Sequence, residues 1–372
     1  MMQDVKINSY QFLVLVILFT IGTSILTVPS ALATGAKQDA WISTIIGTGI
    51  GLLVVWLFTI IANWFPHLTY VQIIEKLFGR WIGKAFSAFF VVITLLYASE
   101  LLYYFGIFLN IHMLPNTPMV ALNILMAGIV VMGVRLGLET FARTAEILIV
   151  VFFVFFLILI VCISPEIKFE NIQPVYEMGT KKIVQSSFFY VIVSSVNAVA
   201  LLMIFPSFVN KMKQSKKTFL IGNLIGGIVI IVITFLCVTV LGSDKTAGAI
   251  YPSYELTKKI NIGNFIQRIE GLMASLWIIT LYIKTTLYFY VSVLGMAQIL
   301  NLKDYRPLTL PLGMIAVILS LVIYPNIIYQ KHFDDTTGNS LTLSIGLFLP
   351  LLLVVVYAIR KRMKKNEIET SE

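Results

Sequence analysis

Long apolar runs constrain this chain more than any other feature of its sequence. A helix crosses the hydrocarbon core of a bilayer in roughly 20 residues, and ten runs of about that length follow one another. The runs lie at residues 10–33, 41–65, 85–113, 118–138, 144–164, 183–209, 218–242, 267–299, 307–329 and 340–360. The sequence therefore predicts an all-α polytopic membrane protein, with about ten transmembrane helices in a single domain over residues 1–372 and a basic cytoplasmic tail at 361–372.

The composition agrees with a bilayer environment and argues against several classes of protein. Apolar residues make up 58% of the chain and charged residues only 12%, whereas soluble domains are about a quarter charged. The net charge of +9 comes from short clusters between the apolar runs, which is typical of lipid-headgroup contact rather than nucleic-acid binding. With no nucleophile–base pair, H-E-x-x-H motif or phosphate-binding glycine loop, and no C-x-x-C spacing around Cys162 and Cys237, we expect no enzyme, cofactor, disulfide or metal site.

Lysine and arginine are divided unevenly between the segments on the two sides of the membrane that the predicted spans would cross. With the N-terminus placed inside, the cytoplasmic segments carry 17 of the 27 basic residues and the outer loops carry 8. Because basic residues concentrate on the cytoplasmic side, we expect both termini inside and residues 165–182 and 243–266 outside. The first run is too long for a signal peptide and is not preceded by a basic segment, so we expect no cleaved leader.

Two connections are longer than turns. Residues 66–84 place Val71, Ile74, Leu77 and Phe78 on one helical face beside basic residues, which predicts a short amphipathic helix on the inner membrane surface. Residues 243–266 form either a helical lid or a solvated loop.

The first span contains residues that favour an interruption. Gly22 lacks a side chain, Thr23 and Ser24 offer hydroxyls, and Pro29 removes an N–H. Inside a membrane a broken helix is tolerated only where it lines a cavity, and its freed amides and carbonyls suit a carboxylate and an ammonium group. The alternative is a kinked helix whose small residues form a packing face.

The sixth span contains a second candidate interruption at Ser194, Ser195 and Asn197, followed by Pro206. Spans one and six correspond if the fold consists of two inverted five-helix repeats, and paired interruptions at matching positions indicate a transporter-type ligand site. We therefore predict that both interruptions line one central cavity.

Ionisable residues within the spans are costly and therefore informative. Glu100 lies midway along the third span and Lys284 midway along the eighth. They either pair with each other and fix the bundle, or face a polar cavity and interact with a ligand or a proton. His112 is expected at the outer interface, and Glu139, Arg143 and Glu146 are expected to form a structural ion-pair cluster.

Three patterns resemble a known family, one in the first span, one after the third and one in the eighth. They are Gln11 with Gly22–Leu26 and Pro29, then LPNTP at 114–118 after Glu100, then QRIEGL at 267–272 with Trp277 and Lys284. The first is similar to the opening of amino acid–polyamine–organocation (APC) transporters. All three together, with the chain length and the lysine-rich tail, resemble the B subunit of spore germinant receptors, the GerAB-like spore germination family.

The resemblance implies a LeuT/APC-type fold of two inverted five-helix repeats. It also implies that the chain recognises a small germinant, usually an amino acid or a nucleoside, in the spore inner membrane together with A- and C-type subunits. One departure is that span six has Asn197 and no acidic residue, where many relatives are expected to carry a glutamate. For this reason the resemblance does not imply that this chain prefers charged ligands or couples to protons through that helix.

Several functions remain compatible with the sequence. A receptor subunit and a working amino-acid permease need the same cavity; a water or ion channel and a scaffold without a ligand are further alternatives. In the transporter architecture that the chain resembles, sodium-driven members hold a cation beside the break of helix one. We expect the Lys284 ammonium to replace that cation, bound by the freed carbonyls of Gly22 and Thr23, so that function needs no sodium.

Overall fold

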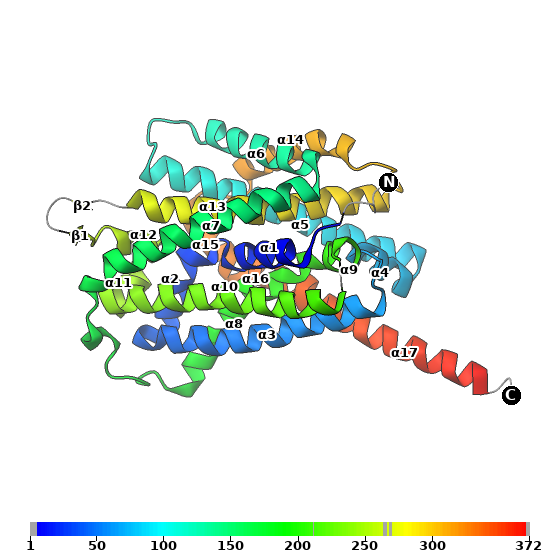
Figure 1. Cartoon of the computed structure of the whole chain (residues 1–372), viewed down its shortest axis with the longest axis horizontal. Coiled ribbons are helices and arrows are strands. Elements are labelled where there is room, and N and C mark those ends of the chain that lie inside the picture. Colours follow the sequence, from blue (N-terminus) through cyan, green and yellow to red (C-terminus); the bar gives the residue numbers. More distant parts are fainter. Residues whose placement is uncertain (1–5, 211, 263–265, 268–269, 370–372) are drawn as a thin grey trace.

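The computed structural model describes residues 6–210, 212–262, 266–267 and 270–369 and is an almost entirely helical bundle (Figure 1). The α-helices are α1 (Ser9–Ile21), α2 (Ser24–Ala36), α3 (Ala40–Trp64), α4 (Tyr70–Phe78), α5 (Arg80–His112), α6 (Met119–Leu136), α7 (Leu138–Ile163), α8 (Gly179–Ser194), α9 (Phe205–Phe208), α10 (Met212–Leu241), α11 (Ser243–Gly248), α12 (Pro252–Thr257), α13 (Glu270–Ile299), α14 (Thr309–Val322), α15 (Ile327–Phe333), α16 (Asn339–Leu343) and α17 (Leu349–Glu369). Seven short 3-10 or π segments join them, among them η4 (Val196–Met203) and η6 (Asp334–Gly338). Strands β1 (Asn261–Ile262) and β2 (Ile266–Gln267) form one small antiparallel pair.

Eight helical segments of the described chain are long and apolar enough to cross a membrane. They are Ser24–Trp64, Arg80–His112, Met119–Leu136, Leu138–Glu166, Gly179–Met203, Gln214–Leu241, Glu270–Ile299 and Ile327–Met363. Ser9–Ile21 and Arg306–Val322 are shorter apolar helices. The all-helical, multi-pass class predicted from the sequence is confirmed, whereas the count of ten spans stays a prediction.

Close helix packing places α1 against α10. A Cβ built on Gly222 or Gly226 of α10 would approach the side chains of Val16 and Thr20 of α1 to 2.7 and 2.8 Å, so only glycine permits this separation. Because lipid tails are as apolar as leucine, helices in a membrane associate mainly through such van der Waals contact between small residues. Helix α13 also contacts α1 and α5 and is buried along most of its length, which makes it the centre of the bundle.

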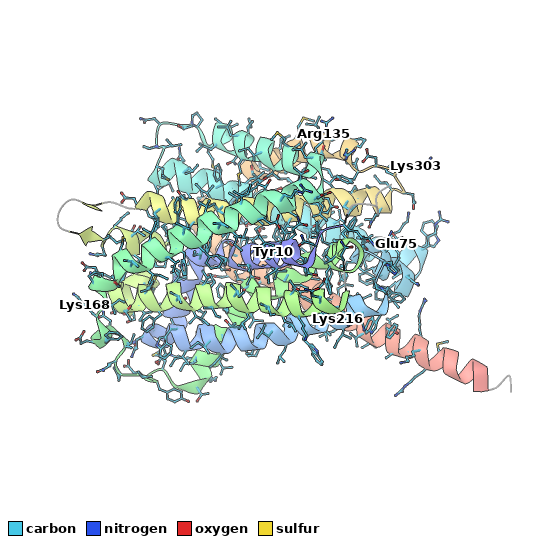
Figure 2. The ribbon with its side chains drawn as sticks, in the orientation of Figure 1. Tyr10, Glu75, Arg135, Lys168, Lys216 and Lys303 are labelled. Carbon is cyan, nitrogen blue, oxygen red and sulfur yellow. The ribbon has the colours of Figure 1, made fainter. Side chains whose placement is uncertain are left out.

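The two ends of the bundle are distinct (Figure 1). Helix α9 and the C-terminal end of α17 lie at one end, and α11, α12 and the two strands lie at the other. Lys216 and Lys303, both predicted to be cytoplasmic, lie at the first end, and Lys168, predicted to be outside, lies at the second (Figure 2). At the first end Ile7 donates its N–H to the Phe208 carbonyl over 2.8 Å, which ties the start of the described chain to α9.

Both long connections, residues 66–84 and 243–266, contain short helices in the structure. Helix α4 begins with a capping box between Thr69 and Gln72, but its residues Val71, Ile74 and Leu77 are buried against the bundle rather than facing the membrane surface. The predicted short helix is present and packs against α5, whereas its place at the inner membrane surface stays a prediction. The described part of residues 243–266 contains α11, α12 and β1.

Candidate functional site

The first span is interrupted at Gly22 and Thr23, between α1 and α2. Gly22 has φ of 37° and ψ of −129°, a conformation that a residue with a Cβ rarely adopts. Its N–H still bonds the Leu18 carbonyl over 2.9 Å, but its own carbonyl leaves the helix and accepts a 2.9 Å hydrogen bond from the Thr280 hydroxyl of α13. A hydroxyl on the central helix thus satisfies the backbone group that the interruption frees.

The sixth span is interrupted where α8 ends at Ser194 and the chain continues as the 3-10 segment η4. The Ser195 hydroxyl donates to Asn223 Oδ1 of α10 over 3.2 Å. Asn197 Nδ2 donates to the Val193 carbonyl over 3.0 Å, whereas its buried Oδ1 has no partner in the described chain. The segment η4 is wound more tightly than an α-helix, and its residue Asn197 lines the cavity described below.

A cavity of about 980 Å³ lies between these interruptions and the central helix. Its walls come from α2, α5, α8 with η4, α13, and the segment from α15 to α16. Of the residues predicted for the site, Thr23, Asn197, Glu100 and Lys284 line the cavity. The other four, Gly22, Ser24, Ser194 and Ser195, belong to the interruptions but are not lining residues.

Lys284 lies against the interruption of the first span. Its side chain is 3% exposed, and its Nζ is 5.3 Å from the centre of the Phe19 ring. A Cβ built on Gly22 would approach Nζ to 3.1 Å, which shows how closely the lysine passes the break. The expected hydrogen bonds to the freed carbonyls are absent among the described residues: Thr280 occupies the Gly22 carbonyl, and the Thr23 carbonyl accepts from Leu26 N–H over 3.1 Å.

Glu100 does not pair with Lys284. The described chain contains two ion pairs, Arg143–Glu139 and Lys258–Glu255, and both are partly exposed. Glu100 is 8% exposed, faces the cavity from α5, and its Oε1 has no hydrogen-bond partner in the described chain. The alternative of an ion pair that locks the bundle is therefore wrong for this structure.

Several lining residues were not predicted as site residues from the sequence, although Trp277 was part of the family pattern. Aromatic side chains reach the cavity from α5 and α13, and an acidic one reaches it from η6; they are Tyr97, Tyr104, Trp277, Tyr288 and Asp334. Trp277 Nε1 and the Tyr288 hydroxyl are buried without a partner in the described part of the chain. A buried unpaired polar atom costs about 1–3 kcal/mol, so groups of this kind around a cavity are suited to binding a polar ligand or water. Their sequence context, an aromatic residue in an apolar run, does not distinguish them from packing residues.

An aromatic cluster covers the end of the cavity next to α12. The His112 ring lies 5.6 Å from Tyr251 and 5.0 Å from Tyr254, both on the α12 segment. Phe108 is 5.4 Å from Tyr251 and 4.6 Å from Trp277, so the cluster connects α12 to α5 and α13. His112 thus lies within an aromatic contact between the α12 segment and the bundle, and its expected position at the outer interface stays a prediction.

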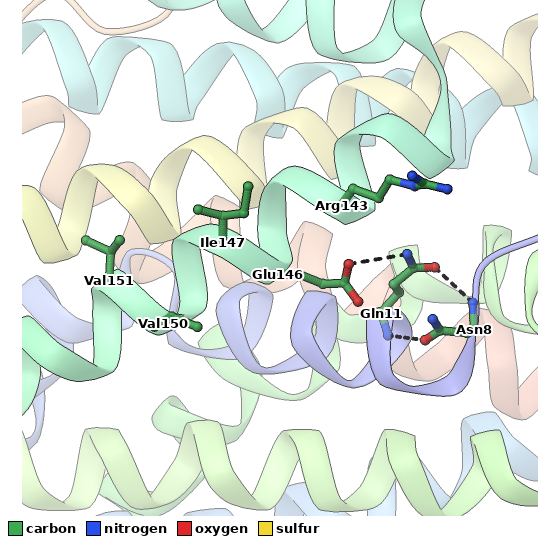
Figure 3. Close-up of a pocket in the computed structure, with 7 residues that line it drawn as sticks. All are labelled: Asn8, Gln11, Arg143, Glu146, Ile147, Val150 and Val151. Carbon is green, nitrogen blue, oxygen red and sulfur yellow. Dashed lines mark hydrogen bonds between the residues drawn. The ribbon is translucent and has the colours of Figure 1, made fainter.

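A second pocket of about 630 Å³ lies between the start of α1 and α7 (Figure 3). Glu146 accepts a 3.5 Å hydrogen bond from Gln11 Nε2 here, and Arg143 pairs with Glu139 instead of Glu146. Ile147 and Val150 also line this pocket and are largely exposed on the outside of the bundle. The expected three-residue ion-pair cluster is therefore reduced to one exposed pair, and this groove faces outward rather than toward the two interruptions.

Sequence similarity connects the chain with proteins of bacterial spores. A family model described as "Spore germination protein" matches residues 6–330. Spore germination protein KB of Bacillus subtilis (strain 168) is 26% identical over 371 residues, covering 98% of each chain. Spore germination protein B2 of the same organism is 21% identical, again with 98% of each chain covered. Of the motif QRIEGL, Arg268 and Ile269 lie outside the described residues.

Similarity to solved structures concerns the fold. Mhp1, a nucleobase-cation-symport-1 family transporter, superposes with a TM-score of 0.72 at 7% identity, covering 95% of this chain and 78% of that one. MhsT in complex with L-phenylalanine superposes with a TM-score of 0.64 at 14% identity, covering 94% and 97%. The fold is therefore that of the LeuT/APC-type transporters, as the resemblance in the sequence implies.

Proposed function

Because the chain belongs to the spore germination protein family, we propose that it is the B-type membrane subunit of a spore germinant receptor in the spore inner membrane. In this function it binds a small germinant, an amino acid or a nucleoside, in the central cavity. The bound germinant changes the arrangement of the helices around the cavity, and A- and C-type subunits respond to that change.

One observation carries this proposal, namely that the 980 Å³ cavity lies where the two interrupted spans meet α5 and α13. Its size suits a small organic molecule, since pockets for such ligands have volumes of about 300–1,000 Å³. Thr23, Asn197 and Lys284 supply a hydroxyl, an amide and an ammonium group to its wall. Interrupted helices at mid-membrane are where proteins of this architecture place their ligands.

A working permease is the second candidate. It is favoured by the fold, because one similar structure is that of a transporter with bromovinylhydantoin bound and another, MhsT, is in complex with L-phenylalanine. A receptor and a permease share the binding step and differ in the step after it, since only a permease must open the cavity to each side in turn. Transport therefore has to be measured separately from sensing.

The proposal is tested in spores that lack the gene and are complemented with the wild-type chain or with Gly22→Leu. Germination is followed as the fall in optical density after addition of each standard L-amino acid, inosine or adenosine. We expect deletion to remove the response to at least one compound, and the wild-type gene but not Gly22→Leu to restore it. An unchanged response profile of the deletion strain to the whole panel would contradict the receptor function.

Transport is tested with the same compounds in radiolabelled form, using the full chain reconstituted in liposomes. The receptor proposal predicts binding without accumulation inside the vesicles. Accumulation that exceeds that of empty liposomes would instead support the permease. Co-purification of A- and C-type subunits with an affinity-tagged chain from spore membranes tests the partners.

A further inference from the structure

Asp334 forms the centre of a polar cluster on the wall of the cavity. The Tyr104 hydroxyl lies 2.9 and 2.8 Å from its two carboxylate oxygens, the Tyr324 hydroxyl donates over 3.2 Å, and Gln330 Nε2 donates over 3.3 Å. All of these donors are neutral, and Asp334 takes part in no ion pair in the described chain. The carboxylate is thus held in a fixed position without its charge being compensated.

Glu100 adds a second carboxylate to this cluster. It lies one helical turn before Tyr104, the residue whose hydroxyl contacts Asp334, and on the same face of α5. Its Oε1 is buried, unpartnered in the described chain, and belongs to a residue that lines the cavity. Two carboxylates that line one cavity repel each other in a low-dielectric environment, so a cation between them would be favoured.

The surroundings of the two carboxylates indicate which kind of cation fits. Aromatic rings surround the cluster: the ring centres of Tyr103 and Tyr324 are 5.0 Å apart, Tyr104 stacks on Tyr324 at 6.4 Å, and Tyr104 lines the cavity. Aromatic faces beside carboxylates suit an organic ammonium group, which gains from both charge and ring contact. The described residues contain no group of three His, Cys, Asp or Glu side chains suited to a metal ion.

Other basic side chains do not neutralise the pair. Lys182 and Lys331 line the cavity, are exposed, and form no ion pair in the described chain. Lys284 also lines the cavity but lies beside Phe19 and the break at Gly22, and within the described residues it has no ion pair with Glu100. A positive charge already present at the break disfavours a second ammonium group there and favours a carboxylate.

We propose that Glu100 and Asp334 form an ammonium subsite of the cavity, and that Lys284 beside the first interruption receives the negatively charged group of the same ligand. The germinant class is then a zwitterionic primary amine, such as an amino acid, rather than an uncharged nucleoside or sugar. This inference rests on the proposed function, since it assumes that the central cavity binds the ligand. It assigns to α5 and η6 the acidic groups that span six does not supply.

The test measures the thermal unfolding midpoint of the full chain in lipid nanodiscs against the concentration of each standard L-amino acid, inosine and D-glucose. We expect an amino acid to be the strongest stabiliser. Its analogue with a hydroxyl in place of the amine should bind about tenfold more weakly or worse, because charge-assisted hydrogen bonds to both carboxylates are lost. Strongest stabilisation by inosine or glucose, or stabilisation by no amino acid, would overturn the proposal.

Variants locate the subsite. Asp334→Asn and Glu100→Gln keep the side-chain shape and should each weaken amino-acid binding about tenfold, whereas Asp244→Asn, an exposed control on α11, should change it less than about twofold. Where either variant fails to fold, Tyr104→Phe tests the same subsite, because it removes a donor to Asp334 and should also weaken binding. Wild-type affinity of Asp334→Asn for the amino acid would overturn the subsite. If Gly22→Leu abolishes amino-acid binding in that case, the proposed function of the cavity stands. If Gly22→Leu also binds normally, the subsite and the proposed function both fail.

Discussion

The Thr280 hydroxyl of α13 donates a 2.9 Å hydrogen bond to the Gly22 carbonyl at the interruption of the first span. Both residues are enclosed in the bundle, and this carbonyl has left the helical hydrogen-bond pattern. The contact joins the broken helix to the central one, and it leaves the Lys284 ammonium, one turn further along α13, available to the cavity. The stability of the chain and its response to a ligand should therefore depend on different residues of α13.

Replacing Thr280 with valine should destabilise the folded chain by about 1–3 kcal/mol, because the buried Gly22 carbonyl loses its donor. Thermal denaturation of the full chain in nanodiscs measures the effect. Thr285→Val is the matched control on the same helix, since the Thr285 hydroxyl donates only to the Leu281 carbonyl of its own helix. Equal destabilisation by the two changes would show that the Thr280 contact has no special role.

Gly22→Leu should abolish the germination response while the chain still inserts into the membrane. The φ of 37° disfavours any side chain, and the added atoms would meet Lys284, so the change disturbs the break and the cavity together. Gly49→Leu on α3 is the control, because no atom lies within 4 Å of a Cβ built there. A normal response of Gly22→Leu spores, with wild-type protein levels by immunoblotting, would exclude a role of the break in sensing.

Lys284→Met should lose the germination response without loss of insertion, because the cavity loses its buried positive charge. Lys284→Arg should fail as well, since a planar guanidinium cannot occupy the space of a compact ammonium group beside Phe19. Lys168→Met, at an exposed position, is the control. The response should also be independent of sodium; a strict sodium requirement, or a normal response of Lys284→Met, would return Lys284 to a structural role.

Cysteine labelling should place both termini in the cytoplasm and residues 165–182 and 243–266 outside. In a chain whose native Cys162 and Cys237 are replaced, cysteine at position 168 should react with an impermeant maleimide in intact cells. Cysteine at positions 216 and 303 should react only after permeabilisation, because these residues lie at the opposite end of the bundle. Outside labelling of positions 216 and 303 would invert the topology.

The structural features that could be predicted from the sequence are those that depend on residues close together along the chain. An apolar run long enough to cross a bilayer becomes a helix because no other backbone arrangement is satisfied there. The first span is interrupted at Gly22 because glycine accepts φ of 37°, which is a local property of one residue. The same reasoning missed Asp334. Residues 330–339 are mostly polar and were therefore assigned to a connection before the last apolar run, whereas in the structure they belong to the same helical segment as that run, Ile327–Met363.

Local sequence patterns were enough to predict the class of the protein and the residues at which the first and sixth spans are interrupted, since each depends on the length or conformational freedom of a short segment. Tertiary packing determines which side chains meet: Thr280 rather than Lys284 bonds the Gly22 carbonyl, and Asp334 lines the same cavity as Glu100, which forms no ion pair with Lys284 in the described chain. Such pairs depend on the rotation and depth of helices distant in the chain. Packing of all the helices together sets both, and no local pattern records it.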